Sequence, residues 1–135
     1  METNKNRHSV YKLQYHLVVS TKFRKPVIDK NINKRLKEIS KNLFENSWDC
    51  KIIEIESEKD HIHILFETKP QIQVSKLINS FKTVSSRLIR KEFKTEIEKY
   101  YWKPFFWNPS YLILTTGGST VEIIKKYIQE QDKPF

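Results

Sequence analysis

The chain has 135 residues and a formal net charge of +9 at pH 7, which suits one basic domain with a proper hydrophobic core. The charge favours a polyanionic partner, although a generally basic surface would give the same value. We expect neither membrane insertion nor secretion, because there is no long apolar run and the N-terminus is polar. The single cysteine, Cys50, excludes an intrachain disulfide framework, disfavours a thiolate zinc site and fits a reducing cytoplasm.

The N-terminal part of the chain is expected to hold a tail, a strand and a basic loop. We treat residues 1–9 as a flexible tail and residues 10–135 as a single domain. From Tyr11 to Ser20, residues of an apolar set alternate with a more polar set, which predicts a strand. The run from Lys22 to Pro26 ends this strand in a basic loop.

The middle of the chain is expected to form a helix, a hairpin and a second helix. Apolar residues at helical spacing predict one helix from Asn31 to about Asn46 and another from Val74 to about Phe93. Two strands, Lys51–Ser57 and Asp60–Thr68, are separated by so few residues that they must join through a tight turn.

The last third of the chain begins with a dense aromatic run between Tyr100 and Trp107. We expect at least half of these rings to close one end of the core, and such rings can also stack on unpaired bases. A strand is predicted over Ser110–Thr116, and the spacing from Ser119 to Glu122 is typical of a capping box that starts a last helix. The apolar stripe expected to face the core consists of Val121, Ile124 and Ile128.

The element order is therefore β-α-β-β-α-β with an extra C-terminal helix. Such an α+β chain forms an antiparallel four-stranded sheet with two helices on one face. In the third strand, Ile62 and Ile64 alternate with His61 and His63. If the apolar set faces the helices, both histidines lie on the open face of the sheet.

His61 and His63 are the first candidate site residues. Histidines two apart on a strand have Cα atoms about 7 Å apart and parallel side chains, which suits two ligands of one metal. An equally good interpretation is a pair of exposed strand histidines without a ligand. Asp60 could bind the metal or orient His61, but a simple turn role is slightly favoured.

Tyr127 and Gln131 lie one helical turn apart on the last helix. A phenol can serve as a nucleophile and an amide oxygen as a metal ligand, although a tyrosine beside an apolar stripe usually packs. A mixed imidazole and amide set admits hard cations such as Mg²⁺ or Mn²⁺, which would polarise a phosphate as Lewis acids.

Five basic residues are candidate contacts to nucleic-acid phosphates. Each of them, taken singly, is more simply a solvated surface charge. Three lie in the basic loop and two on the second long helix: Lys22, Arg24, Lys25, Arg87 and Arg90.

Three ordered segments together resemble a known family. They are the runs from Asp60 to Leu65, from Thr116 to Gly118 and from Tyr127 to Gln131, which read DHIHIL, TGG and YIQEQ. The set is similar to the single-tyrosine HUH transposases, the small TnpA-type enzymes of bacterial and archaeal insertion sequences. The resemblance also includes the segments from Lys22 to Lys25 and from Ser85 to Arg90, so it covers most of the chain.

This resemblance implies a ferredoxin-like or RRM-like fold and a homodimer that acts on single-stranded DNA hairpins at the element ends. Tyr127 matches the family's nucleophile, and His61, His63 and Gln131 match its metal ligands. In that family the tyrosine attacks single-stranded DNA, forms a 5′-phosphotyrosine and frees a 3′-OH. The covalent link conserves the phosphodiester energy. No small-molecule substrate and no membrane are implied.

Two other functions remain open from the sequence. An HUH-type nickase that initiates replication would use the same residues, although the small size of this chain counts against it. A non-catalytic RRM-like module would bind RNA on the open sheet face, but such recognition needs exposed aromatic residues on the central strands. The third strand offers histidines there instead.

Overall fold

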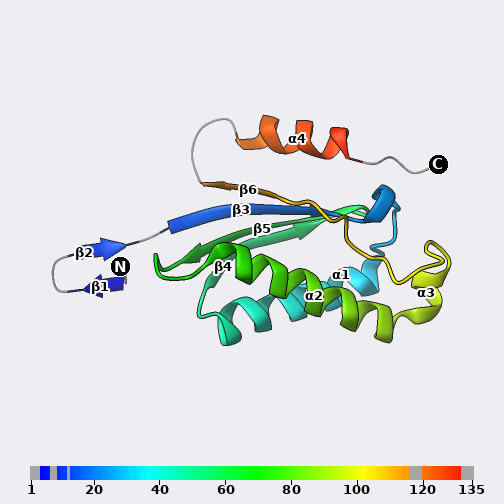
Figure 1. Cartoon of the computed structure of the whole chain (residues 1–135), viewed down its shortest axis with the longest axis horizontal. Helices are drawn as coiled ribbons and strands as arrows, with labels where there is room; N and C mark the ends of the chain where they lie inside the picture. Colours follow the sequence, from blue (N-terminus) through cyan, green and yellow to red (C-terminus); the bar gives the residue numbers. More distant parts are fainter. Residues whose placement is uncertain (1–3, 7–8, 12, 116–119, 132–135) are drawn as a thin grey trace.

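The computed structural model describes residues 4–6, 9–11, 13–115 and 120–131 (Figure 1). Its main sheet has four strands in the order β4-β5-β3-β6, and every neighbouring pair is antiparallel. This confirms the predicted α+β architecture and the predicted hairpin. The strands are β3 (Leu13–Ser20), β4 (Lys51–Ser57), β5 (His61–Thr68) and β6 (Leu112–Thr115).

Helices lie on both sides of this sheet (Figure 1). The helices α1 and α2 cover one face, while α4 lies over the other. None of the described helices is long and apolar enough to cross a membrane. The helices are the 3-10 turn η1 (Lys22–Arg24), α1 (Lys30–Lys41) with its π-helical extension η2 (Asn42–Ser47), α2 (Val74–Glu92), the short α3 (Lys94–Glu98) and α4 (Thr120–Glu130).

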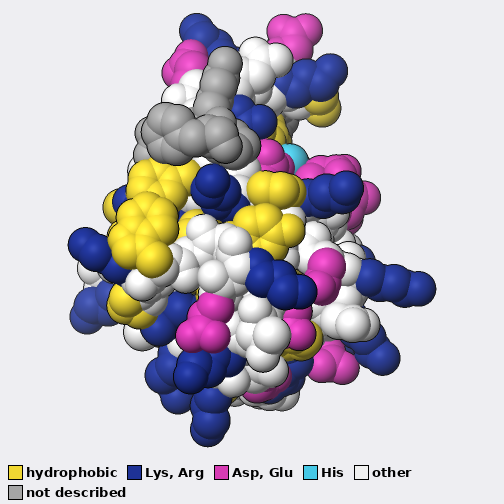
Figure 2. Space-filling model, turned by 90° about the vertical axis from the view of Figure 1, so that its right-hand side faces the viewer, with side chains coloured by type: hydrophobic (Ala, Val, Ile, Leu, Met, Phe, Trp, Pro, Cys, Tyr) yellow, Lys and Arg dark blue, Asp and Glu magenta, His cyan; other side chains and the backbone are white. Residues whose placement is uncertain are grey.

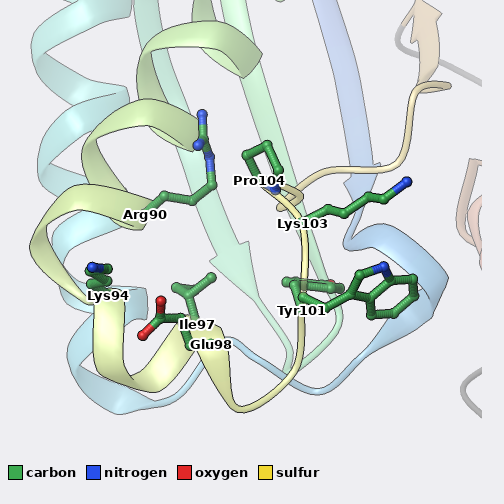
Figure 3. A pocket seen from close by; sticks show the side chains of 8 residues that line it. Arg90, Lys94, Ile97, Glu98, Tyr101, Lys103 and Pro104 are labelled. Carbon is green, nitrogen blue, oxygen red and sulfur yellow. The ribbon is translucent and has the colours of Figure 1, made fainter.

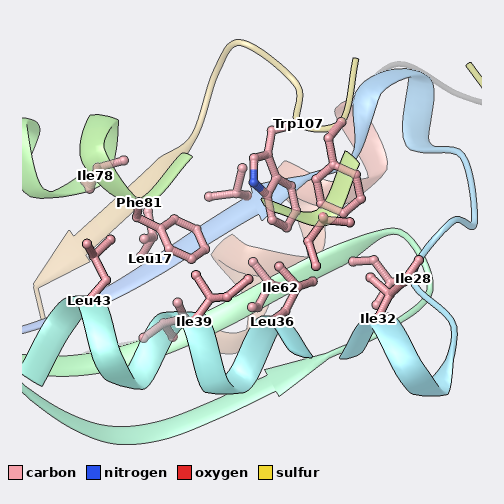
Figure 4. Close-up of a cluster of buried hydrophobic side chains, with 14 of the residues drawn as sticks. Leu17, Ile28, Ile32, Leu36, Ile39, Leu43, Ile62, Ile78, Phe81 and Trp107 are labelled. Atoms are coloured by element: carbon pink, nitrogen blue, oxygen red, sulfur yellow. The ribbon is translucent and has the colours of Figure 1, made fainter. Parts of the chain in front are cut away.

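The hydrophobic core fills the space between the sheet and the helices α1 and α2 (Figure 4). On β5, Ile62, Ile64 and Phe66 are fully buried there, as the alternation predicts. Burying each such side chain contributes about 1.5–3 kcal/mol. The helix α1 starts where the Asp29 carboxylate accepts a 2.8 Å hydrogen bond from the backbone N–H of Ile32, which caps the helix and aims its apolar face at the sheet.

The aromatic run closes one end of this core, as expected. Tyr101, Phe106 and Trp107 are buried, and the Trp107 indole N–H donates a 2.9 Å hydrogen bond to the Ser85 hydroxyl. Trp102 is the exception, with 72% of its surface exposed. The fold therefore uses most of the run for packing and leaves one large ring in solvent.

The N-terminal segment differs from the expected loose tail. Asn4–Asn6 (β1) pairs with Ser9–Tyr11 (β2) in a small antiparallel sheet, and the main strand β3 starts only at Leu13. Pairing between backbone groups needs no apolar alternation, so a polar segment gives little sign of it. Residues 1–3, 7 and 8 of the expected tail lie outside the described residues.

The expectation that α4 packs its apolar stripe into the core is wrong. Val121 is 68% exposed, and Ile124 and Ile128 are only partly buried outside the core cluster. The reason is the surface beneath the helix, where the half-buried imidazoles of His61 and His63 cannot close a dry core. Residues 116–119, with the two glycines and the expected capping Ser119, lie outside the described residues.

Candidate active site on the open sheet face

The two histidines of β5 lie on the sheet face opposite the core. His61 pairs with Ser20 of β3, and His63 pairs with Val18. Residues paired across an antiparallel ladder project to the same face, so this register brings β3 side chains beside both imidazoles. Both histidines are partly exposed, whereas their neighbour Ile62 is fully buried.

Asp60 orients the first imidazole. Its carboxylate accepts a 2.9 Å hydrogen bond from Nδ1 of His61 and a 3.3 Å hydrogen bond from Nε of Arg24. The geometry fits the orienting role better than direct ligation, and it leaves Nε2 of His61 as the nitrogen that can hold a ligand. Asp60 also occupies the turn before β5, so it both orients His61 and serves as a turn residue.

Arg24 reaches Asp60 from a strained loop. Phe23 and Arg24 both have left-handed backbone angles, with φ of 57° and 52°. Non-glycine residues adopt this conformation only when surrounding contacts hold them there. The Tyr101 hydroxyl donates a 2.7 Å hydrogen bond to the Lys22 carbonyl, and the Thr21 hydroxyl donates one of 2.7 Å to the Lys25 carbonyl. The loop is thus anchored to the core beside the site.

His16 is a site residue that the sequence analysis missed. Its Nδ1 lies 2.8 Å from Nε2 of His63, and the two rings stack with centroids 5.1 Å apart. Burial, followed by the nearby His16, lowers the pKa of His63, which keeps that imidazole neutral at pH 7, as a metal ligand must be. The alternation of β3 places His16 on the open face, but only the strand register brings it to His63.

Tyr127 and Gln131 meet a second missed residue, Ser110. The Ser110 hydroxyl lies 3.1 Å from the Tyr127 hydroxyl and donates to the Gln131 amide oxygen at 3.3 Å. That amide oxygen also accepts a 3.4 Å hydrogen bond from the Ser20 hydroxyl. Because Ser20 pairs with His61, the amide reaches the strand beside the first imidazole.

The phenol is protonated at neutral pH in this arrangement. Burial raises the pKa of Tyr127, and the hydrogen bond to Ser110 offsets only part of that rise. A neutral phenol is a weak nucleophile, so the reaction it could perform requires loss of its proton. The side chain is nevertheless partly open to solvent, where a substrate can reach it.

A cavity of about 520 Å³ separates the imidazoles from α4. The apolar stripe of α4 borders it, which explains why this stripe is not in the core. Tyr127 and Gln131 lie outside its lining and contact the β6 side through Ser110. The lining residues are Glu58, His61, His63, Val121, Ile124, Lys125, Ile128 and Gln129.

The donor set fits a hard divalent cation whose shell is completed by a substrate. Among the described residues, no three His, Cys, Asp or Glu side chains gather as a metal cluster. The two imidazole nitrogens would not complete the coordination shell of such a cation, so oxygen donors are needed as well. The Gln131 amide oxygen near Ser20 is a donor of this kind. Phosphate oxygens of a nucleic acid could supply the rest, and the cavity beside the imidazoles offers space for them.

The five predicted phosphate contacts do not gather at this site. Lys22 and Arg24 lie in the loop beside Asp60, where the Lys22 ammonium lies over the Phe23 and Phe105 rings. Lys25 follows in the same loop. Arg87 and Arg90 belong to α2, which covers the opposite face of the sheet (Figure 1).

Comparison with known proteins identifies the family. The family model described as "Transposase IS200 like" matches residues 9–131, nearly the whole chain. The chain belongs to the IS200-like transposase family. Over 131 residues this IS200-like transposase is 31% identical to the ISDra2 transposase TnpA of Deinococcus radiodurans, covering 97% of the chain and 92% of that relative.

Solved structures show the same fold. A crystal structure of a transposase from Deinococcus radiodurans superposes with a TM-score of 0.88 at 30% identity, covering 97% of this chain and 99% of that one. A REP-associated tyrosine transposase, solved bound to a REP hairpin, superposes with a TM-score of 0.59 at 9% identity. That match covers 92% of this chain and 68% of the other. The RRM-like α+β fold expected from the resemblance is confirmed.

Proposed function

We propose that this IS200-like transposase cuts and rejoins single-stranded DNA at the ends of an insertion sequence, with Tyr127 as the nucleophile. The observation that carries the proposal is the meeting of Tyr127 and Gln131 at Ser110, with the Gln131 amide reaching Ser20 beside His61. A phenol, an amide oxygen and an imidazole thus come to one end of a single sheet face. Membership of a transposase family supports this assignment.

In the proposed step, the Tyr127 oxygen attacks the scissile phosphorus. A bond forms between that oxygen and phosphorus, the bond to the departing 3′ oxygen breaks, and the phenol loses its proton. The products are a 5′-phosphotyrosine and a free 3′-OH. The bond energy stays in the phosphotyrosine, so a second 3′-OH can reverse the step on another strand without ATP.

His61, His63 and Gln131 are proposed to hold Mg²⁺ or Mn²⁺. When bound, such an ion would polarise the scissile phosphate and offset developing charge. Asp60 fixes the His61 ring through Nδ1, and His16 contacts Nε2 of His63. With these contacts, His61 would bind the ion through Nε2. His63 would bind it through Nδ1, or through Nε2 after losing its contact with His16.

The proposed substrate is a DNA hairpin with a single-stranded arm, and the proposed active form is a homodimer. The net charge of +9 favours a DNA backbone. The REP-associated transposase of the same fold was solved with a REP hairpin, which supports hairpin recognition in this fold. A site on a sheet face cannot easily reach a phosphate inside an intact duplex, so unpaired DNA suits it better.

The experiment is incubation of the protein with end-labelled DNA, Mg²⁺ and fixed salt, followed by a denaturing gel. We expect a covalent adduct with a single-stranded hairpin, and no adduct after chelation of the metal. Mass spectrometry should place the attached nucleotide on the peptide that contains Tyr127. Equal cleavage of a perfect duplex would instead favour the nickase, and hairpin binding without any adduct would favour a non-catalytic module.

A further inference from the structure

An exposed indole lies at the end of the molecule that carries the strained loop. Trp102 stacks on Phe23 with ring centroids 6.0 Å apart and planes 7° from parallel, and Phe105 meets it edge-on at 5.9 Å. These contacts fix the ring in one orientation. Since 72% of the residue is exposed, much of the ring is still open to solvent. Figure 2 shows hydrophobic side chains at this end of the molecule, next to Lys and Arg side chains.

Cations surround a shallow cavity of about 290 Å³ beside this ring. Arg90 and Lys94 come from the end of α2 and the start of α3, while Lys103 and Pro104 come from the loop that follows (Figure 3). The lining thus has three cations and one carboxylate. Its residues are Arg90, Lys94, Ile97, Glu98, Tyr101, Trp102, Lys103 and Pro104.

Direct contacts join this surface to the candidate active site. Phe23, which stacks on Trp102, is followed in the chain by Arg24. Arg24 donates to Asp60, and Asp60 accepts from His61. The loop and α3 lie at the same end of the sheet in Figure 1. We therefore expect a single DNA strand that runs from the imidazoles across this loop to come near Trp102.

We propose that Trp102 and the cavity beside it bind an unpaired nucleotide in the single-stranded arm of the DNA substrate. The base stacks on the indole, and Arg90, Lys94 and Lys103 contact neighbouring phosphates. Stacking on an aromatic ring combined with cations along the backbone is the general way that proteins hold single strands. The proposal rests on the proposed function, because it assumes a single-stranded substrate.

Charge favours this occupant over a second copy of the chain. A symmetric contact would bring the same patch of both copies together, and the three cations of one would face those of the other. A paired base in intact duplex has no free face to offer the ring, so an unpaired base is the fitting ligand.

The test measures binding of full-length protein to a fluorescent hairpin with a single-stranded arm and to the same hairpin without the arm. Trp102→Ala should weaken binding of the arm-bearing DNA about tenfold or more, while Trp102→Phe keeps most of the affinity. The armless hairpin should bind all three proteins alike. Lys103→Gln should weaken arm binding and flatten its salt dependence, whereas Lys37→Gln on α1 should change neither.

Intrinsic fluorescence gives a second readout that needs no cleavage. Oligothymidylate should quench the wild-type tryptophan signal, and most of that quenching should disappear in Trp102→Phe. Unchanged arm binding in Trp102→Ala would overturn the proposal, as would a shift in its sedimentation from dimer to monomer, which would make this surface a subunit interface. Failure of the proposed function gives a different result, in which wild type forms no adduct while binding of the arm still depends on Trp102.

Discussion

The two faces of the main sheet differ in packing, although the same strands form both. On β5, Ile62, Ile64 and Phe66 are fully buried beneath α1 and α2, while the alternating His61 and His63 stay partly exposed beneath α4. One face is filled by apolar side chains, and the other keeps a cavity of about 520 Å³ bordered by imidazoles. Because successive side chains of a strand point to opposite faces, neighbouring residues of β5 contribute either to the core or to the candidate site.

On the polar face, the candidate site residues are held by hydrogen bonds to neighbouring polar side chains. His61 is fixed by Asp60, His63 by His16, and Gln131 by hydroxyl groups. The helix α4 adds little apolar contact, since Val121 remains 68% exposed. We therefore expect this face to open to a substrate at a smaller free-energy cost than the opposite face.

The strongest loss of stability is expected on the sheet face that α1 and α2 cover. Phe81 is fully buried, and its ring contacts Phe44 and Trp107. Phe81→Ala should lower the free energy of unfolding by about 3–5 kcal/mol through lost burial and a residual cavity. Val121→Ala on α4 should change it by less than about 0.5 kcal/mol. Urea unfolding measures both, and a similar loss in the two variants would remove the distinction between the faces.

The opposite pattern is expected for the imidazoles. His61→Ala or His63→Ala should lower the cleavage rate on the order of a hundredfold, because part of the proposed Lewis-acid stabilisation is lost. The melting temperature should change little, since both side chains lie outside the core cluster. Calorimetry with Mn²⁺ provides the check on the metal, and unchanged affinity in the double variant would disprove this site.

A smaller effect, which depends on pH, is expected at Tyr101 in the core cluster. Burial raises the pKa of Tyr101, so the folded state holds its proton more tightly than the unfolded state does. This stability is fully present below the unfolded pKa of about 10 and is lost as the pH rises beyond it. Between about pH 10 and 11, wild type should lose about 1 kcal/mol more than Tyr101→Phe. Parallel pH curves in urea titrations would contradict this.

The sequence predicts the fold well where local patterns decide it. Alternation and turn spacing place β4 and β5 within a residue of their observed bounds, and helical spacing predicts α2 almost in full. These patterns are reliable because the spacing of apolar residues along a helix or strand matches the side chains that it buries. The short α3 was missed, because its five residues include a single apolar side chain, Ile97, and so show no helical period.

The candidate site could be predicted only in part. His61, His63 and Asp60 share one local motif, which the sequence displays directly. The contact of His16 with His63 depends on the register of two strands far apart in the chain, and Ser110 matters only because β6 and α4 come together. The apolar stripe of α4 stays outside the core because the surface beneath it is polar, and no pattern within the helix reveals that polarity.

Tyr127 is proposed to form the covalent bond to DNA. Tyr127→Phe removes the phenol oxygen and its hydrogen bond to Ser110, whereas Ser110→Ala keeps the phenol oxygen and removes the contacts of the Ser110 hydroxyl with Tyr127 and Gln131. Both proteins should fold and bind a labelled hairpin with nearly wild-type affinity. In the denaturing gel with Mg²⁺, Ser110→Ala should still form the covalent adduct and Tyr127→Phe should form none. An adduct that persists in Tyr127→Phe would show that another residue is the nucleophile.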